Sequence, residues 1–139
     1  MAGYTLVALQ FSLISIICIL GLSDNIMSNY RLLLAFGGIF IGLYAVYSMK
    51  FSMSVLPKPK HGQDLVTSGI YQYLRHPAYL AILLFSLAFV YSLLTIGLFL
   101  ILICVLVIKM NLEEKMLSEK FDKYSSYKQQ TKRLIPFIF

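Results

Sequence analysis

Long apolar runs separated by short polar segments dominate the chain. The first run covers residues 4–22 and the second covers residues 32–49, each close to the roughly 20 residues that a membrane-spanning helix needs. The third run, residues 77–108, is too long for one upright helix. A helical hairpin that turns near residues 91–95 fits this run better than one steeply tilted helix. We therefore expect spans at about 77–91 and 95–108.

This pattern predicts an all-α integral membrane protein with about four transmembrane helices in a single domain. Of the 139 residues, 59% are hydrophobic, and the mean hydropathy is +0.78. A soluble domain of this size could not bury so much apolar surface. After residue 108, Leu112, Met116 and the charged residues around them follow helical spacing, which predicts an amphipathic C-terminal helix within a cytosolic tail, residues 109–139.

The basic residues predict the orientation in the membrane. The formal net charge is +6, and eleven of the twelve Lys and Arg residues lie within residues 50–76 or after residue 108. With four spans these two regions fall on the same side, and the positive-inside rule makes that side cytoplasmic. Both termini are then cytoplasmic and residues 50–76 form a cytosolic loop. Because the charges flank apolar runs, the predicted partner is the lipid bilayer and not a nucleic acid.

The apolar runs contain no Asp, Glu, Lys, Arg or His. Transporters and proton relays usually carry an ionisable residue at membrane depth, so the chemistry is expected at the cytoplasmic interface. Cys18 and Cys104 lie inside apolar runs without metal-ligand spacing, and we expect neither a disulfide nor a metal site. Gly38 and Gly42 form a small-xxx-small pair, which fits either packing within the chain or a homodimer contact.

Two polar segments carry the candidate chemistry. Pro77 suits the first turn of a helix, and Arg75 and His76 precede it, so this helix start could bind an anion or could only anchor the chain at the interface. Glu113 and Glu114 follow the last apolar run, where a carboxylate can face the polar loop. Alternatively, Glu113 only neutralises Lys109, which lies four residues earlier on the same helix face. His61 is either a ligand or a solvated loop histidine.

These segments together resemble the isoprenylcysteine carboxyl methyltransferases and, more distantly, are similar to the phospholipid methyltransferases. The resemblance covers roughly residues 56–139 and rests on five pieces in the same order as in the family: Leu65-Val-Thr-Ser-Gly-Ile-Tyr71; Arg75-His-Pro-Ala-Tyr79; Glu113-Glu114-Lys-Met-Leu117; Phe121, Tyr124 and Tyr127; and Leu134-Ile-Pro-Phe137. The combined pattern is specific, whereas any single piece would be weak.

The resemblance implies a cytosolic S-adenosylmethionine pocket and a lipophilic or lipidated acceptor, such as an isoprenylcysteine-like carboxylate, that enters between helices. It implies that Lys109 and Arg75 act on the acceptor, although Lys109 stands where the family often has arginine and lacks the planar guanidinium. By position, the implied cofactor-binding residues are Gln63, Asp64, Leu65, Val66, Tyr71, His76, Pro77, Ala78, Tyr79 and Glu113.

The sequence therefore predicts a membrane methyltransferase that uses S-adenosylmethionine, of the carboxyl O-methyltransferase type. One alternative is a lipid amine N-methyltransferase, in which His76 or Glu114 would accept the proton. Others are a non-catalytic four-helix membrane protein and a small transporter. The enzyme prediction requires Tyr71, His76 and Glu113 to meet at one face of the membrane.

Overall fold

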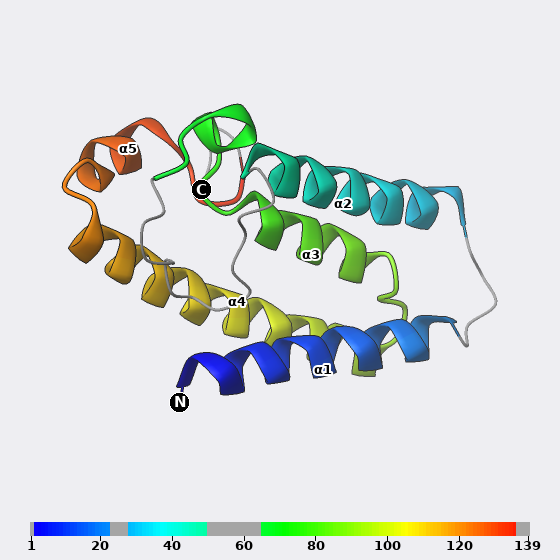
Figure 1. Ribbon diagram of the computed structural model, residues 1–139. Coiled ribbons are helices and arrows are strands. Elements are labelled where there is room, and N and C mark those ends of the chain that lie inside the picture. Colours follow the sequence, from blue (N-terminus) through cyan, green and yellow to red (C-terminus); the bar gives the residue numbers. More distant parts are fainter. Residues whose placement is uncertain (1, 23–27, 50–64, 136–139) are drawn as a thin grey trace.

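The computed structural model describes residues 2–22, 28–49 and 65–135, and these ranges contain helices and no strand, which confirms the all-α prediction (Figure 1). Predicted site residues Gln63 and Asp64, and the candidate His61, lie outside the described residues. The elements in chain order are α1 (Ala2–Leu22), α2 (Asn29–Ser48), the 3-10 turn η1 (Gly69–Gln72), α3 (Pro77–Leu87), α4 (Leu93–Lys120) and α5 (Tyr124–Gln130).

Three of the described helices, α1, α2 and α4, are long and apolar enough to cross a membrane. Helix α3 is apolar but has 11 residues, which gives a length of about 17 Å against a hydrocarbon core of about 30 Å. The expected third span, over residues 77–91, is therefore not confirmed as a full spanning helix, and neither is the count of four spans. The chain still turns back after α3, but at residues 88–92 and not at 91–95.

A capping box sets this earlier turn. Ser92 is the N-cap of α4; its hydroxyl accepts from the Thr95 amide at 3.3 Å, and the Thr95 hydroxyl accepts from the Ser92 amide at 2.9 Å. These two bonds satisfy donors that a helix start otherwise leaves unpaired. Helix α4 then continues without a break to Lys120, past the expected boundary at residue 108. The last expected span and most of the predicted amphipathic segment therefore form one continuous helix, and α5 is a separate helix after it.

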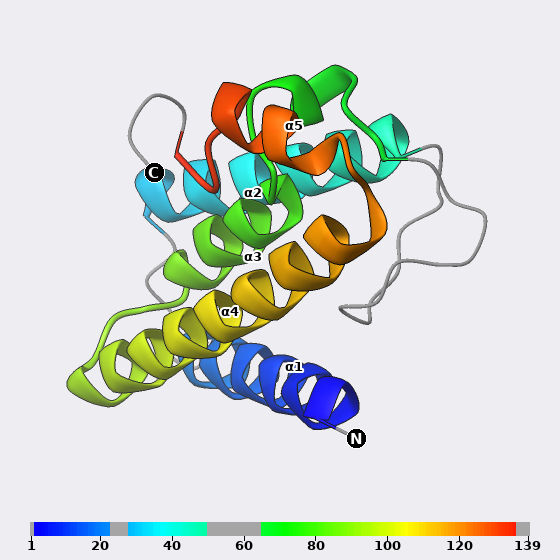
Figure 2. The ribbon, with the colours of Figure 1, turned by 90° about the vertical axis from the view of Figure 1, so that its left-hand side faces the viewer.

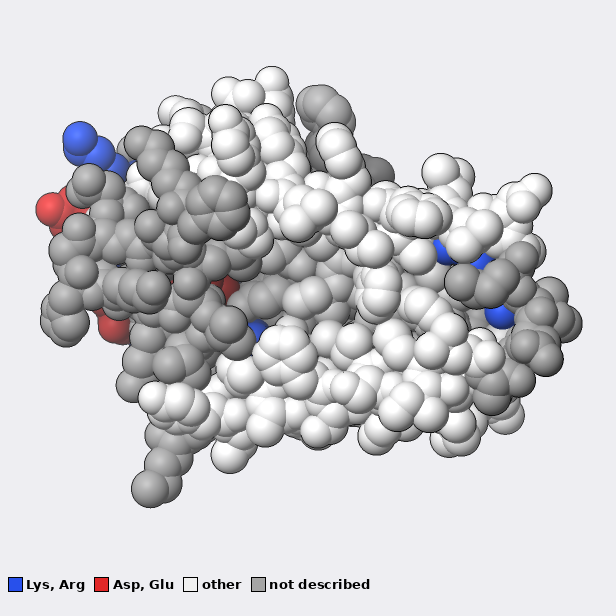
Figure 3. All heavy atoms as spheres, turned by 45° about the vertical axis from the view of Figure 1, so that its right-hand side comes forward, with Lys and Arg blue, Asp and Glu red and all other residues white. Residues whose placement is uncertain are grey.

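The helices form two layers, with α2 packed along α3 and α1 packed along α4 (Figures 1 and 2). A Cβ on Gly38 would lie 2.7 Å from the Phe85 nitrogen and 2.8 Å from the Ala81 oxygen, so α2 meets the backbone of α3 directly. The Gly38–Gly42 pair thus serves packing within the chain. Uncharged side chains cover most of the described surface on the face that Figure 3 shows, and Phe40, for example, is 71% exposed. This surface suits lipid and not water.

A short parallel bridge between Leu74 and Lys132 fixes the last described residues beside the start of α3. The Arg75 amide donates to the Lys132 oxygen at 2.7 Å, and the His76 amide donates to the Arg133 oxygen at 3.0 Å. From α5, the Tyr127 hydroxyl donates to the Tyr71 oxygen at 2.6 Å. As a result α5, η1 and the start of α3 gather at one end of the molecule, as Figure 2 shows.

Candidate functional site

A polar group joins the start of α3 to α4 at this end. The Tyr79 hydroxyl donates to Glu113 Oε2 at 2.9 Å, and His76 Nδ1 lies 3.6 Å from the same oxygen. The rings of His76 and Tyr79 stack, with centroids 5.4 Å apart and an interplanar angle of 14°. The Glu113 side chain remains 30% exposed, so its carboxylate can still accept bonds from a ligand.

The positions of His76 and Tyr79 at the start of α3 explain why both side chains reach Glu113. Pro77 begins α3, so Tyr79 projects from its first turn, while His76 is the N-cap residue. The His76 side chain does not cap the helix, because its ring is turned toward the glutamates of α4. The first turn of α3 therefore keeps its partial positive charge, although Pro77 has no N–H and the Tyr79 amide already donates to the His76 oxygen at 3.1 Å.

Tyr71 lies at the same end of the molecule. Burial raises the pKa of its hydroxyl, and the negative charge of Glu113 raises it further. His76 and Glu113 thus meet directly, and Tyr71 lies in η1 at the same end of the molecule; a shared role of the three residues stays a prediction.

Lys109 lies one turn before Glu113 on α4, but its ammonium turns elsewhere. Its Nζ donates to Gln10 Oε1 of α1 and lies 5.3 Å from the centre of the Tyr79 ring. Lys109 is 1% exposed and Gln10 is 3% exposed. The Lys109–Glu113 ion pair that the sequence offered as an alternative is not formed. Glu113 is held by Tyr79, and Lys109 is held by Gln10.

Glu114 has a different environment from Glu113. Its carboxylate, 4% exposed, accepts from Arg75 Nε at 3.0 Å and from Arg133 Nη2 at 2.8 Å. His76 Nε2 lies 3.2 Å from it and Lys128 Nζ 3.5 Å. A buried carboxylate with this many donors around it has a structural role. Glu114 is therefore poorly suited to accept a proton from a substrate.

Arg75, which was expected to act on the acceptor, faces the same cluster. Besides Glu114, its guanidinium donates to the backbone oxygens of Lys128 and Thr131. These contacts tie α5 and the segment after it to the start of α3. The geometry gives Arg75 a structural role, and its action on the acceptor stays a prediction.

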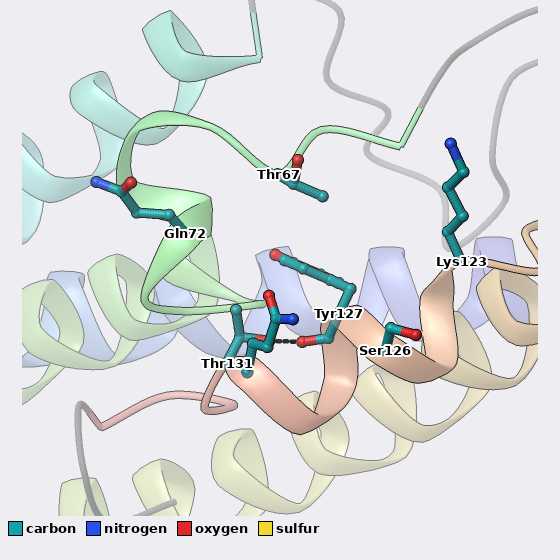
Figure 4. Close-up of a pocket in the computed structure, with 7 residues that line it drawn as sticks. Thr67, Gln72, Lys123, Ser126, Tyr127 and Thr131 are labelled. Atoms are coloured by element: carbon teal, nitrogen blue, oxygen red, sulfur yellow. Dashed lines mark hydrogen bonds between the residues drawn. The ribbon is translucent and has the colours of Figure 1, made fainter.

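A polar cavity of about 290 Å³ lies between the segment around η1 and α5, as Figure 4 shows. Tyr127 and Thr131 are its buried members, and the Thr131 hydroxyl donates to the Tyr127 oxygen at 2.7 Å. The residues that line the cavity are Thr67, Gln72, Lys123, Ser126, Tyr127, Gln130 and Thr131. None of these was predicted as a site residue. Two of the residues that line it, Thr67 and Gln72, directly follow the predicted site residues Val66 and Tyr71 in the sequence.

The remaining described cofactor predictions are apolar residues in the same region. Leu65 and Val66 are half-buried in the segment before η1, Pro77 is buried and Ala78 is half-buried in the first turn of α3. Their role as cofactor ligands stays a prediction.

Sequence reasoning missed Gln10 and Arg133. Gln10 is the only amide side chain in the first apolar run, and this could have marked it as a residue that needs a buried polar partner. Arg133 gives no such local signal, because only the Leu74–Lys132 bridge brings it to Glu114.

The fold and site define a helical membrane protein with a polar, carboxylate-bearing centre where α3 begins and α4 leaves the apolar layer. A family model described as phospholipid methyltransferase matches residues 27–124. The chain therefore belongs to the phospholipid methyltransferase family, which identifies it as a membrane methyltransferase and agrees with the more distant of the two resemblances. No curated protein and no solved structure shows a significant match.

Proposed function

We propose that this protein transfers a methyl group from S-adenosylmethionine to a lipophilic acceptor that carries an anionic group, at the cytoplasmic interface of the membrane. The observation that carries the proposal is an arrangement on α4: Glu113, part-exposed and held by Tyr79, lies one turn from the buried Lys109, which is held by Gln10. An acidic and a basic side chain thus lie one turn apart on the same helix without forming an ion pair with each other.

The residues around Glu113 fit S-adenosylmethionine, which when bound supplies a methyl group on a positively charged sulfur. A carboxylate beside the stacked rings of His76 and Tyr79 offers negative charge and aromatic faces, and both attract cations. The uncapped start of α3 lies next to them and favours an anion such as a carboxylate. The site therefore has surfaces for the cationic and the anionic parts of this cofactor.

Lys109 would orient the acceptor. Its ammonium can hold a carboxylate or a phosphate as a point charge, without the two-pronged geometry of arginine. A carboxylate acceptor is ionised at neutral pH and needs no general base. For this reason the carboxyl O-methyltransferase reaction requires no proton acceptor among the residues present.

The second candidate is methylation of a lipid amine, which is also consistent with a family described as phospholipid methyltransferase. An amine must lose a proton. Glu114 is occupied by its basic neighbours, so His76, whose Nδ1 faces the part-exposed Glu113, is the better acceptor of that proton.

The chain's own contribution to the reaction is placement. Lys109 and Glu113 are fixed on one continuous helix and hold the two reactants in a constant relation. Such a proximity effect can supply roughly 7–11 kcal/mol. The hydroxyl of Tyr79 keeps the Glu113 carboxylate in position, and burial among α1, α3 and α4 keeps water from Lys109.

The experiment combines binding and labelling in phosphatidylcholine nanodiscs. We expect Glu113→Gln to weaken S-adenosylmethionine binding about tenfold or more, and Glu119→Gln, an exposed position on the same helix, to leave it unchanged. With radiolabelled methyl donor and membrane lipid, label released by base as methanol indicates an ester, and base-stable label indicates an N-methyl product. Unchanged binding in Glu113→Gln, or no transfer to any lipid extract, would refute the proposal.

A further inference from the structure

The polar cavity between the segment around η1 and α5 shares none of its described lining residues with the group around Glu113. Its volume of about 290 Å³ lies just below the range of about 300–1,000 Å³ that is usual for drug-sized ligands, so it suits a smaller molecule. Tyr127 and Thr131 form its buried wall, and their hydroxyls already donate to backbone oxygens. The fold therefore fixes this wall. In Figure 4 Thr67 faces the Tyr127 ring across the cavity.

The side chains at the rim of the cavity have unused hydrogen-bonding groups. The exposed lining residues are Thr67, Gln72, Lys123, Ser126 and Gln130. Within the part of the chain that the structure describes, none of these side chains makes a hydrogen bond or an ion pair. Together they carry hydroxyl, amide and ammonium groups, which can donate to and accept from several sides of one ligand.

Lys123 differs from the other basic residues at this end of the molecule. Arg75, Lys128 and Arg133 surround Glu114, whereas Lys123 has no acidic partner in the described ranges. Among the described residues, no Asp or Glu lines the cavity. The charge on its rim is therefore positive. It favours an anion and disfavours a cation such as the sulfonium of S-adenosylmethionine.

The lining favours a ligand that comes from water. Among the described lining residues, none is Ala, Val, Leu, Ile or Met, so the chains of a lipid would find no aliphatic wall. Side-chain amides and hydroxyls instead pair well with the hydroxyl groups of a ligand. The ring of Tyr127 adds an apolar face with room for a carbon skeleton. These features together suit a small molecule that has both hydroxyl groups and negative charge.

We propose that the polar cavity binds a small hydroxylated anion of the sugar-phosphate class. Lys123 holds the phosphate, and the amides and hydroxyls at the rim bind the hydroxyl groups. Because the lining residues come from both the η1 segment and α5, the ligand joins these two segments beside the existing bond from Tyr127 to Tyr71. The ligand is therefore an effector that holds α5 in place, and it is not a reactant.

The test is equilibrium binding of radiolabelled glucose 6-phosphate to the full chain in phosphatidylcholine nanodiscs. We expect saturable binding. Inorganic phosphate and glucose should each displace the label about tenfold less well than unlabelled glucose 6-phosphate, or worse, because each has only one of the two recognised features. A second series uses nanodiscs that contain phosphatidylinositol, whose headgroup combines a phosphate with a hydroxylated ring. Binding there should equal that in phosphatidylcholine alone.

Two matched pairs of exposed residues locate the site. Lys123→Gln removes the positive charge at the rim, and Lys115→Gln makes the same change on α4 away from the lining. Gln130→Glu adds a negative charge to the lining, and Gln129→Glu adds it at the neighbouring position, which does not line the cavity. We expect Lys123→Gln and Gln130→Glu to weaken binding about tenfold or more, and the two control variants to bind like the wild type.

Four results would overturn the site or its ligand class. They are no saturable binding to the wild type, unchanged affinity in Lys123→Gln and Gln130→Glu, equal displacement by phosphate or by glucose, and loss of binding in the phosphatidylinositol nanodiscs. The last result would assign the cavity to a lipid headgroup. The site is independent of the proposed function, because Glu113→Gln, which should lose S-adenosylmethionine, should bind glucose 6-phosphate like the wild type.

Discussion

Arg133 holds Glu114 with two nearly parallel hydrogen bonds, Nε to Oε1 at 3.1 Å and Nη2 to Oε2 at 2.8 Å. This two-pronged geometry is the strongest form of a charged hydrogen bond in proteins. It joins the end of the described chain to α4, and Arg75 reaches the same carboxylate from the start of α3. Glu114 is therefore the point at which three segments of the site are held together.

Glu114→Ala should destabilise the protein by about 3–5 kcal/mol, because it leaves buried cationic partners without a carboxylate. The measurement is thermal unfolding in micelles, with limited proteolysis to detect release of α5 from the body. Glu119→Ala, an exposed position on the same helix, serves as the control. Equal melting temperatures for the two variants would mean that the Glu114 cluster does not hold the tail.

The two neighbouring glycines of α2 should respond in opposite ways to the same change. A Cβ at Gly38 would approach the backbone of α3 to 2.7 Å, whereas a Cβ at Gly37 would meet nothing within 4 Å. We expect Gly38→Ala to cost about 1–3 kcal/mol through overpacking, and Gly37→Ala to be neutral or slightly stabilising, since alanine favours helix. Thermal unfolding of the two variants gives the comparison, and a tolerated Gly38→Ala would contradict the close contact.

Tyr79→Phe should weaken cofactor binding without unfolding the protein. The change removes the hydroxyl that holds Glu113 and keeps the ring that stacks on His76. Hydrogen bonds to charged groups contribute about 1.5–3 kcal/mol, so we expect S-adenosylmethionine affinity to fall by about tenfold or more. Equilibrium binding in nanodiscs measures this, with Tyr73→Phe, whose side chain is exposed, as control. Equal affinities for both variants would show that Glu113 does not need Tyr79.

Local patterns predicted the elements of this fold well. The expected first run, residues 4–22, corresponds to α1, and Pro77 begins α3 as its fixed backbone angle favours. The turn was misplaced because hydropathy continues through residues 88–92, while the Ser92–Thr95 capping box determines where α4 starts. Hydropathy reports burial, but hydrogen bonds at the helix ends decide where a helix begins.

Contacts between distant residues were less accessible from the sequence. Gln10 and Lys109 are separated by 99 positions, and no local pattern fixes the register between α1 and α4 that brings them together. Spacing of four residues favoured a Lys109–Glu113 pair, yet each side chain found a better-placed partner on another helix. The ordered motifs did place His76, Tyr79 and Glu113 in one region, because both segments leave the apolar layer at the same end.

Stability should fall at alkaline pH because of the buried tyrosines that join α5 to η1. Burial raises the pKa of Tyr127 to about 12, and burial also raises the pKa of Tyr71 and of Tyr124. The fold thus favours the protonated phenol. The stabilisation is complete below the unfolded pKa of about 10 and is lost as pH rises from there through about 12.

Tyr127→Phe isolates this effect, because phenylalanine keeps the ring and cannot ionise. At neutral pH the variant should be less stable by about 0.5–1.5 kcal/mol, since it loses the hydrogen bond to the Tyr71 oxygen. As pH rises above about 10 the wild type loses stability faster, so the two melting temperatures should converge. Tyr47→Phe, an exposed position on α2, should follow the wild type throughout. A constant gap between wild type and Tyr127→Phe would mean that the Tyr127 phenol does not ionise against the fold, and the alkaline loss would then have to come from other groups.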